Sequence, residues 1–508
     1  MFVGSLKQNK YEAWAKPLLV VSILIFVLIR LIKGPGGDGM PETYSSFFFF
    51  CSLGAFLIYK KAWNADEKLN IMIVFIAAYT VRFIAAIIFF PYFTSIHWSD
   101  HWMYIRVGQI LSHHWNMDMY KLMAAMNISG HQGFYVFVAS HMRINPNPIF
   151  IVPTNTFLSA YSTVLLYNIC RNFHSTDNDR KILLAGTMLF AFFPRSIFYS
   201  TVLLKEAATC FLCLLFIDNM FKFFKGKLIE PVILMILALI PLFSLRIYLM
   251  PILLLTLFIS VFWYREKSER GRKLAIGILA LFVASFVLLW VIFPKSSFFG
   301  LAFYYIFHEI GSKGVLQTLM EARGEFSNEG VTSYAQLKYT SIGQMLLYFP
   351  VGLLRTFVTP IQWFREGKDV RDTVEVYMAV LWYLLMPFVF AGFYDMVKRK
   401  LKSALPVITY VVLVILFVSV IFMGSQTRHN NLMYPFLCLF AAYGISRWRE
   451  LLPFTFAVYF ILGIIITAAE ASIKGTLLLL GPSCLAIMIG VIVCLAKADN
   501  QRQKLTIK

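Results

Sequence analysis

One carboxylate, Asp100, follows closely on the apolar run 71–90 in a segment rich in aromatic residues. Ser99 is the predicted N-cap of the helix that follows, so Asp100 can serve merely to stabilise the start of that helix. Its alternative role is that of a general base, which takes the proton of a hydroxyl group as that hydroxyl attacks. His101 and Tyr104 lie on the same predicted helix and are candidate substrate contacts.

A second group of ionisable residues interrupts a later apolar region. Arg195, Lys205 and Glu206 stand within or beside the runs 182–199 and 201–221, where charged groups are costly unless they face a partner or a cavity. Glu206 is a second candidate catalytic acid, and the two cations are candidate phosphate ligands. Lys205 and Glu206 do not share a helix face, so we expect separate partners. Pairing between helices is the alternative to a functional role.

Three further residues bring positive charge or donor groups near the predicted membrane boundary. Arg246 separates the runs 229–244 and 247–264, and Arg428 and His429 occupy a short polar segment. Guanidinium groups suit phosphate because they donate two parallel hydrogen bonds. Any one arginine can instead extend to the membrane surface or pair with another side chain. Several arginines on the same side as two carboxylates would suit a lipid-phosphate site.

The elements that must position these residues are apolar runs of helix length. The chain has 508 residues, 59% of them hydrophobic, and a mean hydropathy of +0.71. These values exclude a soluble globular protein, a coiled coil and a disordered chain, and predict an all-α polytopic membrane protein. The runs lie at 17–32, 44–59, 71–90, 149–169, 182–199, 201–221, 229–244, 247–264, 274–293, 341–361, 376–397, 405–423, 431–446, 451–469 and 475–496.

The net charge of +20 arises mainly from short clusters of Lys and Arg between these runs. Such clusters mark cytosolic loops of membrane proteins, and their dispersion argues against a nucleic-acid partner. All of them can be cytosolic if the run 341–361, which contains Pro350 and Pro360, enters the membrane without crossing it. We therefore expect about fourteen spans, cytosolic termini and two long outer regions, 91–148 and 294–375.

This pattern predicts four segments and no disulfide framework. The cysteines lie in or at the ends of apolar runs, and Cys210 and Cys213 have no second ligand pair for zinc. The predicted segments are an N-terminal transmembrane hairpin (1–70), a catalytic transmembrane module (71–293) that contains the first outer loop (91–148), a second outer loop with the re-entrant segment (294–375), and C-terminal transmembrane helices (376–508).

The order of these features resembles the GT-C superfamily of polyprenyl-phosphate-dependent glycosyltransferases, in the branch of protein O-mannosyltransferases and aminoarabinose transferases. Asp100 matches the acid of the first outer loop, and Lys205-Glu206 resembles the element of the second. Arg428, followed by Asn431-Leu432-Met433-Tyr434-Pro435-Phe436, resembles the late arginine and proline-bearing span of that branch. The resemblance covers about residues 71 to 446, and its motifs are short.

The resemblance implies a GT-C-like bundle in the plasma (inner) membrane, with its active site on the periplasmic or extracellular face. It implies inverting transfer of a sugar from a polyprenyl-phosphate-linked donor to a glycan, lipid or protein hydroxyl, with Asp100 as base. No cofactor is certain, and a divalent metal stays open because His101, not a second acid, follows Asp100. The hairpin 17–59 is also extra to the family pattern.

Two other activities are compatible with parts of the sequence. An O-antigen polymerase or ligase would fit the long outer region 294–375, although the early Asp100 does not fit it. A transporter or flippase of polyprenyl-linked glycans would be expected to show interrupted helices in both halves of the chain. Only the run 341–361 shows such an interruption, so we favour the glycosyltransferase.

Overall fold

The computed structural model describes the chain in two compact units, one of residues 1–307, 400–411 and 431–439 and the other of residues 308–399, 412–430 and 440–508. All regular secondary structure in the described part of the chain is helical. The described residues are 20–24, 40–61, 63–95, 99–115, 122–123, 126, 132–173, 177–227, 229–246, 248–263, 277, 343–344, 349–350, 352–353, 356–357, 370–421 and 427–446.

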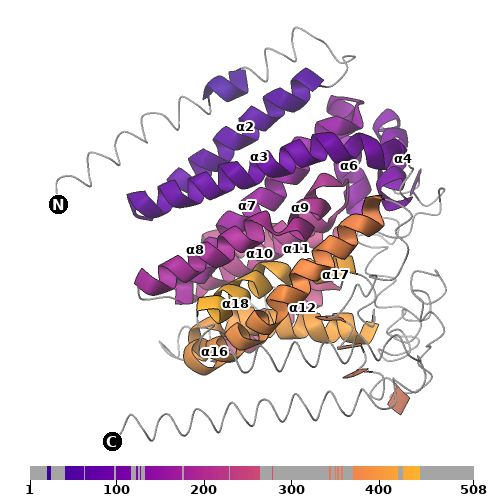
Figure 1. The fold of residues 1–508 in the computed structure, drawn as a ribbon. Helices are drawn as coiled ribbons and strands as arrows, with labels where there is room; N and C mark the ends of the chain where they lie inside the picture. The colour runs from indigo at the N-terminus through magenta and orange to yellow at the C-terminus, as the bar shows by residue number, and fades with distance from the viewer. Residues whose placement is uncertain are drawn as a thin grey trace, which may run out of the picture. The chain divides into compact units, whose positions relative to one another are not determined.

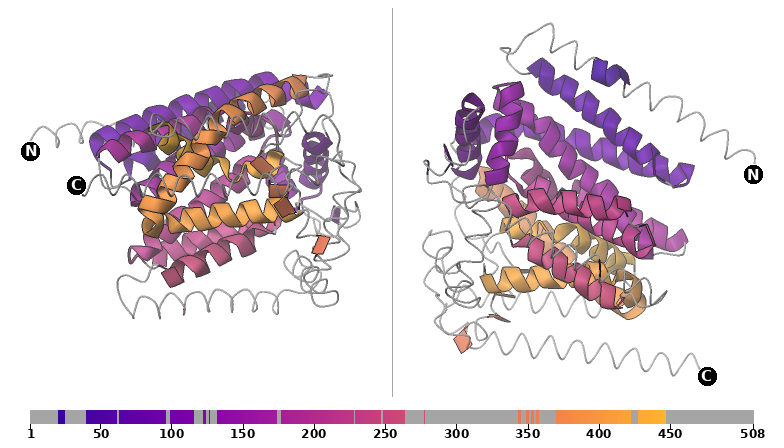
Figure 2. Two further views of the ribbon diagram at one scale, coloured as in Figure 1. Left: turned by 60° about the horizontal axis from the view of Figure 1, so that its bottom comes forward. Right: turned by 180° about the vertical axis from the view of Figure 1, so that it is seen from behind.

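The first unit is a helical bundle built around α7. Its helices are α2 (Met40–Tyr59), α3 (Ala65–Ser95), α4 (Ser99–His113), α6 (Gln132–Ile144), η2 (Pro148–Ile151), α7 (Val152–Cys170), η3 (Arg171–Phe173), α8 (Asp177–Phe192), α9 (Pro194–Thr201), α10 (Glu206–Phe224), α11 (Ile229–Leu245) and α12 (Leu249–Trp263). α7 packs against α2, α3, α8 and α10 and is buried along almost its whole length. α4 and α6 lie together at one end of this bundle (Figures 1 and 2).

Several helices of the described chain are long and apolar enough to cross a membrane. In the described residues they are Ala65–Tyr92, Pro148–Cys170, Glu206–Phe224 and Ser403–Ile421, and the pair Arg180–Phe192 and Pro194–Thr201 would add a fifth if it forms one bent span. A helix can cross because all its backbone polar groups pair within the segment. The described chain is therefore that of an all-helical protein with several candidate membrane spans.

The predicted run 182–199 is two helices instead of one. α8 ends at Phe192, α9 begins at Pro194, and the two are bent by 44° relative to each other. Proline disfavours the helical conformation of the preceding residue and suits the first position of a new helix. Phe193 accordingly has extended backbone angles, φ −65° and ψ 122°. The next helix, α10, then starts at Glu206, five residues after the start of its predicted run.

Helix α16 (Val370–Ile421) continues through the basic residues 398–402, which the sequence predicts as a loop between two spans. Lysine, arginine and leucine are good helix formers, and no proline occurs there before Pro406. The short helix α17 (Thr427–Asn430) and helix α18 (Tyr434–Ser446) follow it. Residues of α16 and of α18 occur in both units.

In the second unit, side chains bind the main chain of the predicted re-entrant run. The Asn430 side-chain amide donates to the Thr356 carbonyl at 2.8 Å, and the Trp382 indole donates to the Phe357 carbonyl at 2.7 Å. The Thr356 hydroxyl also lies 3.0 Å from that of Ser419. Main chain at membrane depth needs such partners where it leaves regular helix. Most of 341–361 lies outside the described residues, so its re-entrant course stays a prediction.

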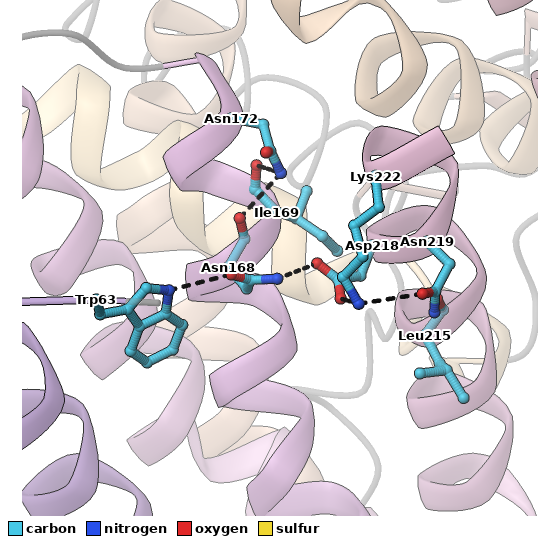
Figure 3. Close-up of polar contacts among 8 residues, drawn as sticks. All are labelled: Trp63, Asn168, Ile169, Asn172, Leu215, Asp218, Asn219 and Lys222. Carbon is cyan, nitrogen blue, oxygen red and sulfur yellow. Dashed lines mark hydrogen bonds and ion pairs between the residues drawn. The ribbon is translucent and has the colours of Figure 1, made fainter. Parts of the chain in front are cut away.

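A polar cluster lies in the first unit beside the start of α3, the end of that helix away from α4. Figure 3 shows its residues. The Trp63 indole donates to the Asn168 side-chain oxygen at 3.2 Å, and the Asn168 amide donates to Asp218. Asp218 is buried and pairs with Lys222 at 2.9 Å. These residues connect the segment before α3 to α7 and α10. Lys60 and Lys61 follow α2, and Arg171 follows α7. The prediction that these basic residues face the cytosol requires the two helix ends to lie on one side of the membrane.

Several predictions concern residues outside the described part of the chain. The runs 17–32, 274–293, 451–469 and 475–496 and the outer region 294–375 lie wholly or mostly there. The predicted number of about fourteen spans is therefore not tested. The predicted run 44–59 is helical as α2, but α2 is not among the candidate spans.

Candidate functional site

Asp100 lies in the first turn of α4, which begins at Ser99 instead of after it as the N-cap prediction implied. The next residue, His101, is fully buried, and both of its ring nitrogens are engaged within the protein. Its Nδ1 lies 3.0 Å from the backbone nitrogen of Leu203, and its Nε2 lies 3.0 Å from the hydroxyl of Thr94. His101 therefore joins the end of α3 and the start of α4 to the segment that leads into α10.

These partners determine which ring nitrogen of His101 carries the proton. The Leu203 N–H can only donate, so Nδ1 accepts and Nε2 bears the hydrogen. The Thr94 hydroxyl accepts from Nε2 and donates to the Phe90 carbonyl at 2.8 Å. Burial lowers the pKa of His101 to about 4, which keeps the ring neutral near pH 7. His101 thus holds the start of α4 against the segment before α10, and its role as a substrate contact stays a prediction.

A second side chain holds the segment between α9 and α10. Asn155, buried in α7, donates to the carbonyl of Ser200 at 2.9 Å and to that of Val202 at 3.2 Å. These contacts and the His101 bond secure the main chain just before Lys205. Lys205 is itself buried, with 3% of its surface exposed, and its carbonyl accepts the Thr209 hydroxyl at 2.7 Å. The elements around Lys205 and Glu206 are therefore well anchored.

Glu206 forms a buried ion pair with Arg246. The pair joins the first residue of α10 to the connection between α11 and α12, and the two side chains are 2% and 3% exposed. Arg246 also donates to the hydroxyl of Tyr248, whose ring it overlies at 5.8 Å. Glu206 and Tyr248 together give the guanidinium a defined orientation. The prediction that Glu206 has a partner other than Lys205 is confirmed, and that partner is Arg246. Because the arginine engages its carboxylate, Glu206 is not a free acid.

The Arg246 pair and Asp100 are linked through two tyrosines. Tyr104 of α4 and Tyr135 of α6 have ring centroids 5.0 Å apart. Tyr104 acts electrostatically on Arg246, and Asp100 acts electrostatically on Tyr135. Burial, and to a smaller extent the nearby charge of Asp100, raise the pKa of Tyr135 to about 12. We call Asp100, Tyr104, Tyr135, Glu206 and Arg246 the α4–α10 cluster.

Close packing of α6 against α11 brings Tyr135 to this cluster. Gly133 lies so near Ser244 that a Cβ atom on it would collide with the Ser244 hydroxyl. Only glycine permits this approach without a shift of one helix. Arg246 follows Ser244 by two residues, so the contact places the start of α6 next to the arginine-bearing connection.

Arg195 belongs to a different set of contacts. It is buried at the start of α9, donates to the hydroxyl of Tyr434 and lies over that ring at 5.2 Å. Lys205 follows the other end of α9, and eight helical residues span about 12 Å. Arg195 and Lys205 are therefore separated by the length of a helix.

A fully buried arginine, Arg82, supports the break between α8 and α9. Its guanidinium donates to the carbonyl of Ala191 at 2.6 Å and to the hydroxyls of Ser159 at 3.0 Å and Ser196 at 2.9 Å. It also donates to the Ala78 carbonyl of its own helix at 3.2 Å. Arg82 thereby joins α3, α7, α8 and α9 near the point where α8 ends.

Arg428 and His429 lie in α17, which belongs to the second unit. His429 is buried, with 4% of its surface exposed, and the side chain of Arg428 is outside the described residues. Their predicted role in binding phosphate is not tested.

The described residues do not form a metal-binding set. No three His, Cys, Asp or Glu side chains in the described ranges lie close enough to hold an ion. In the α4–α10 cluster, Glu206 is engaged by Arg246, and the neighbouring His101 uses both ring nitrogens within the protein.

The sequence reasoning missed four residues of this region: Arg82, Tyr135, Asn155 and Tyr248. Arg82 and Asn155 had a usable signal, because each is a polar residue within a predicted apolar run, where it needs a partner. Tyr135 and Tyr248 had none, because aromatic residues are frequent throughout the chain, at 17%.

The chain resembles solved protein structures, although its sequence matches no known family. No model of a protein family and no curated protein sequence matches the chain. The chain is similar to the archaeal oligosaccharyltransferase AglB from Archaeoglobus fulgidus, solved in complex with an inhibitory peptide and a dolichol-phosphate. The TM-score is 0.45 and the sequence identity is 12%. The match covers 83% of this chain and 56% of AglB, so the chain spans little more than half of that protein's length.

Proposed function

We propose that the protein is a membrane glycosyltransferase that transfers a sugar from a polyprenyl-phosphate-linked donor to a hydroxyl acceptor on the extracytoplasmic face. The observation that carries the proposal is the α4–α10 cluster. In it, Asp100 lies within electrostatic range of Tyr135 and Arg246 within that of Tyr104, the two tyrosine rings are 5.0 Å apart, and Arg246 has a defined orientation. A base and a fixed cation are the two groups that displacement of a phosphate from a sugar requires.

Asp100 is the proposed base of this reaction. Its carboxylate would take the acceptor proton while the acceptor oxygen bonds to the anomeric carbon. The bond between that carbon and the phosphate oxygen breaks in the same displacement, and the electron pair leaves with the phosphate. A single displacement inverts the configuration of the sugar.

Arg246 is the proposed stabiliser of the leaving phosphate. Negative charge grows on the phosphate oxygen in the transition state, and a cation that is already oriented stabilises it without reorganisation. Glu206 and Tyr248 supply that orientation, which makes Glu206 a positioning residue in this mechanism. Lys205, buried one residue away, adds positive charge. Arg428 remains a proposed phosphate ligand from the resemblance, and Arg195 from its place as a charged group within an apolar run.

The decisive experiment is Asp100→Asn in the purified full-length protein. Short-chain polyprenyl phosphates carrying mannose, glucose, galactose or N-acetylglucosamine serve as donors, and release of the polyprenyl phosphate is measured. Loss of a general base lowers turnover by about 10² to 10⁴ fold. Asp66→Asn is the matched control, because Asp66 is exposed at the far end of α3. Unchanged turnover in Asp100→Asn would reject the base role.

A further inference from the structure

A cavity of 520 Å³ lies beside the second half of α4, towards the opposite end of that helix from Asp100. Arg106, Gln109 and His113 follow the spacing that places side chains on one face of a helix. Other described residues that line the cavity are Ile110, Ser112, His114 and Pro146. The cavity thus lies between one face of α4 and the turn that follows α6.

The described lining is basic and rich in donors. Arg106 is exposed, and its guanidinium can bind a carboxylate or phosphate through two hydrogen bonds. The Nδ1 of His114 lies 2.9 Å from the Ile110 carbonyl, which can only accept, so Nδ1 carries a hydrogen. The Nε2 of that ring is then the atom that can meet a ligand. No carboxylate is present among these lining residues.

The walls of the cavity are held by contacts of their own. The main-chain nitrogen of Asn147 donates to the Asn145 side chain at 2.9 Å, and that of Ile149 donates to the Asn147 side chain at 3.1 Å. The two residues that flank Pro146 are therefore held in place. Helix α4, which bears most of the described lining, is held against α6 by the close packing of Gly108 on Val138. The cavity is therefore part of the packed fold.

We propose that this cavity binds a sugar that carries a carboxylate or a phosphate group. Its volume lies within the range of small-molecule sites, about 300 to 1,000 Å³, and exceeds what an inorganic ion needs. Arg106 would bind the anionic group, while Gln109 and the imidazoles of His113 and His114 suit sugar hydroxyls.

The position of the cavity along α4 connects it to an acceptor. His113 lies thirteen positions after Asp100 on this helix, which corresponds to about 20 Å. A sugar bound here is therefore a remote part of an extended acceptor chain. This link rests on the proposed function, whereas binding of an anionic sugar can be measured without any transfer reaction.

The test measures equilibrium binding to the full-length protein in phosphatidylcholine nanodiscs by calorimetry. The probes are glucuronate, glucose 1-phosphate, glucose and inorganic phosphate. The charged sugars should bind saturably and glucose should bind at least about tenfold more weakly. Arg106→Gln should weaken binding of the charged sugars by about tenfold or more, because one charge-assisted contact is lost. Arg143→Gln, at an exposed position near the end of α6, is the matched control and should bind as the wild type does.

Three results would overturn the proposal. Equal affinities for glucose and glucuronate would show that binding does not require an anionic group. An unchanged affinity in Arg106→Gln would show that the charged sugars do not bind in this cavity. Inorganic phosphate that binds as tightly as glucose 1-phosphate would show a site for a free ion. Nanodiscs with phosphatidylglycerol provide a further arm: loss of sugar binding there would identify a lipid headgroup as the occupant. Failure of Asp100→Asn to abolish transfer would affect none of these measurements.

Discussion

At the scale of single residues, the site depends on pairings between groups that are costly to bury alone. Glu206 and Arg246 are each almost fully buried, and each compensates the charge of the other. The sequence identified both residues as ionisable groups out of place in apolar surroundings, and it predicted that Lys205 and Glu206 have different partners. It did not predict which arginine pairs with Glu206, since these positions are forty residues apart.

Glu206→Gln should destabilise the protein strongly. Removal of one partner of a buried ion pair leaves an uncompensated charge, which costs about 3 to 5 kcal/mol. The expected result is a lower apparent unfolding temperature in detergent, and the double variant Glu206→Gln with Arg246→Gln should recover most of the loss. Glu230→Gln, at an exposed position in the first turn of α11, is the control. An unfolding temperature equal to that of the wild type would contradict the buried pair.

His101 should make stability depend on pH. Its folded-state pKa, about 4, lies below the value of about 6.5 expected for the unfolded chain. Between these values the unfolded state binds more protons, so the contribution of His101 is complete above about pH 6.5 and is lost as the pH falls towards about 4. Apparent unfolding temperatures measured from about pH 4.5 to about pH 7.5 should show this slope. In His101→Asn the slope should be smaller, and an identical slope would refute the assignment.

At the scale of elements, the break between α8 and α9 determines where the second group of charges lies. Pro194 is visible in the sequence, but the run 182–199 is mostly apolar and of helix length, so it predicts one span. The break is stabilised by Arg82, which lies more than a hundred residues earlier and satisfies the Ala191 carbonyl near the end of α8. No local pattern connects these two positions.

Arg82→Met should loosen α9 and the segment that leads to Lys205. The variant loses four hydrogen bonds, and buried acceptors left without a partner cost about 1 to 3 kcal/mol each. Hydrogen exchange of residues 194–205 should rise, with α12 as the internal reference. Arg82→Lys keeps the charge but has three donors on a single nitrogen, so an intermediate effect is expected. Equal exchange in all three proteins would show that Arg82 does not support the break.

At the scale of the whole molecule, the distribution of charge predicts which side of the membrane each segment faces. The described basic residues Lys60, Lys61, Arg171, Lys222 and Lys225 occur at the ends of helices far from α4. This grouping follows from the order and length of the helices. The face on which α4 lies remains a prediction from the rule that positive loops stay in the cytosol.

Labelling of single introduced cysteines in intact cells tests this orientation. His113→Cys, on α4, should react with a membrane-impermeant maleimide, whereas Lys225→Cys, after α10, should react only after the cells are lysed. The native Cys170, Cys210, Cys213 and Cys438 are buried. Labelling of the wild-type protein measures the background reaction of the other native cysteines. Reaction of Lys225→Cys in intact cells would reverse the predicted topology.

The helical membrane class, the approximate bounds of several helices and the residues that could carry charge chemistry follow from the amino-acid sequence alone. These properties are local, because a membrane helix satisfies its main chain within one segment and is recognised by its own composition. The pairing of Glu206 with Arg246 and the bond of His101 to the Leu203 main chain become visible only in the folded chain. Those contacts depend on which helices pack together, and packing joins positions whose separation along the chain carries no signal.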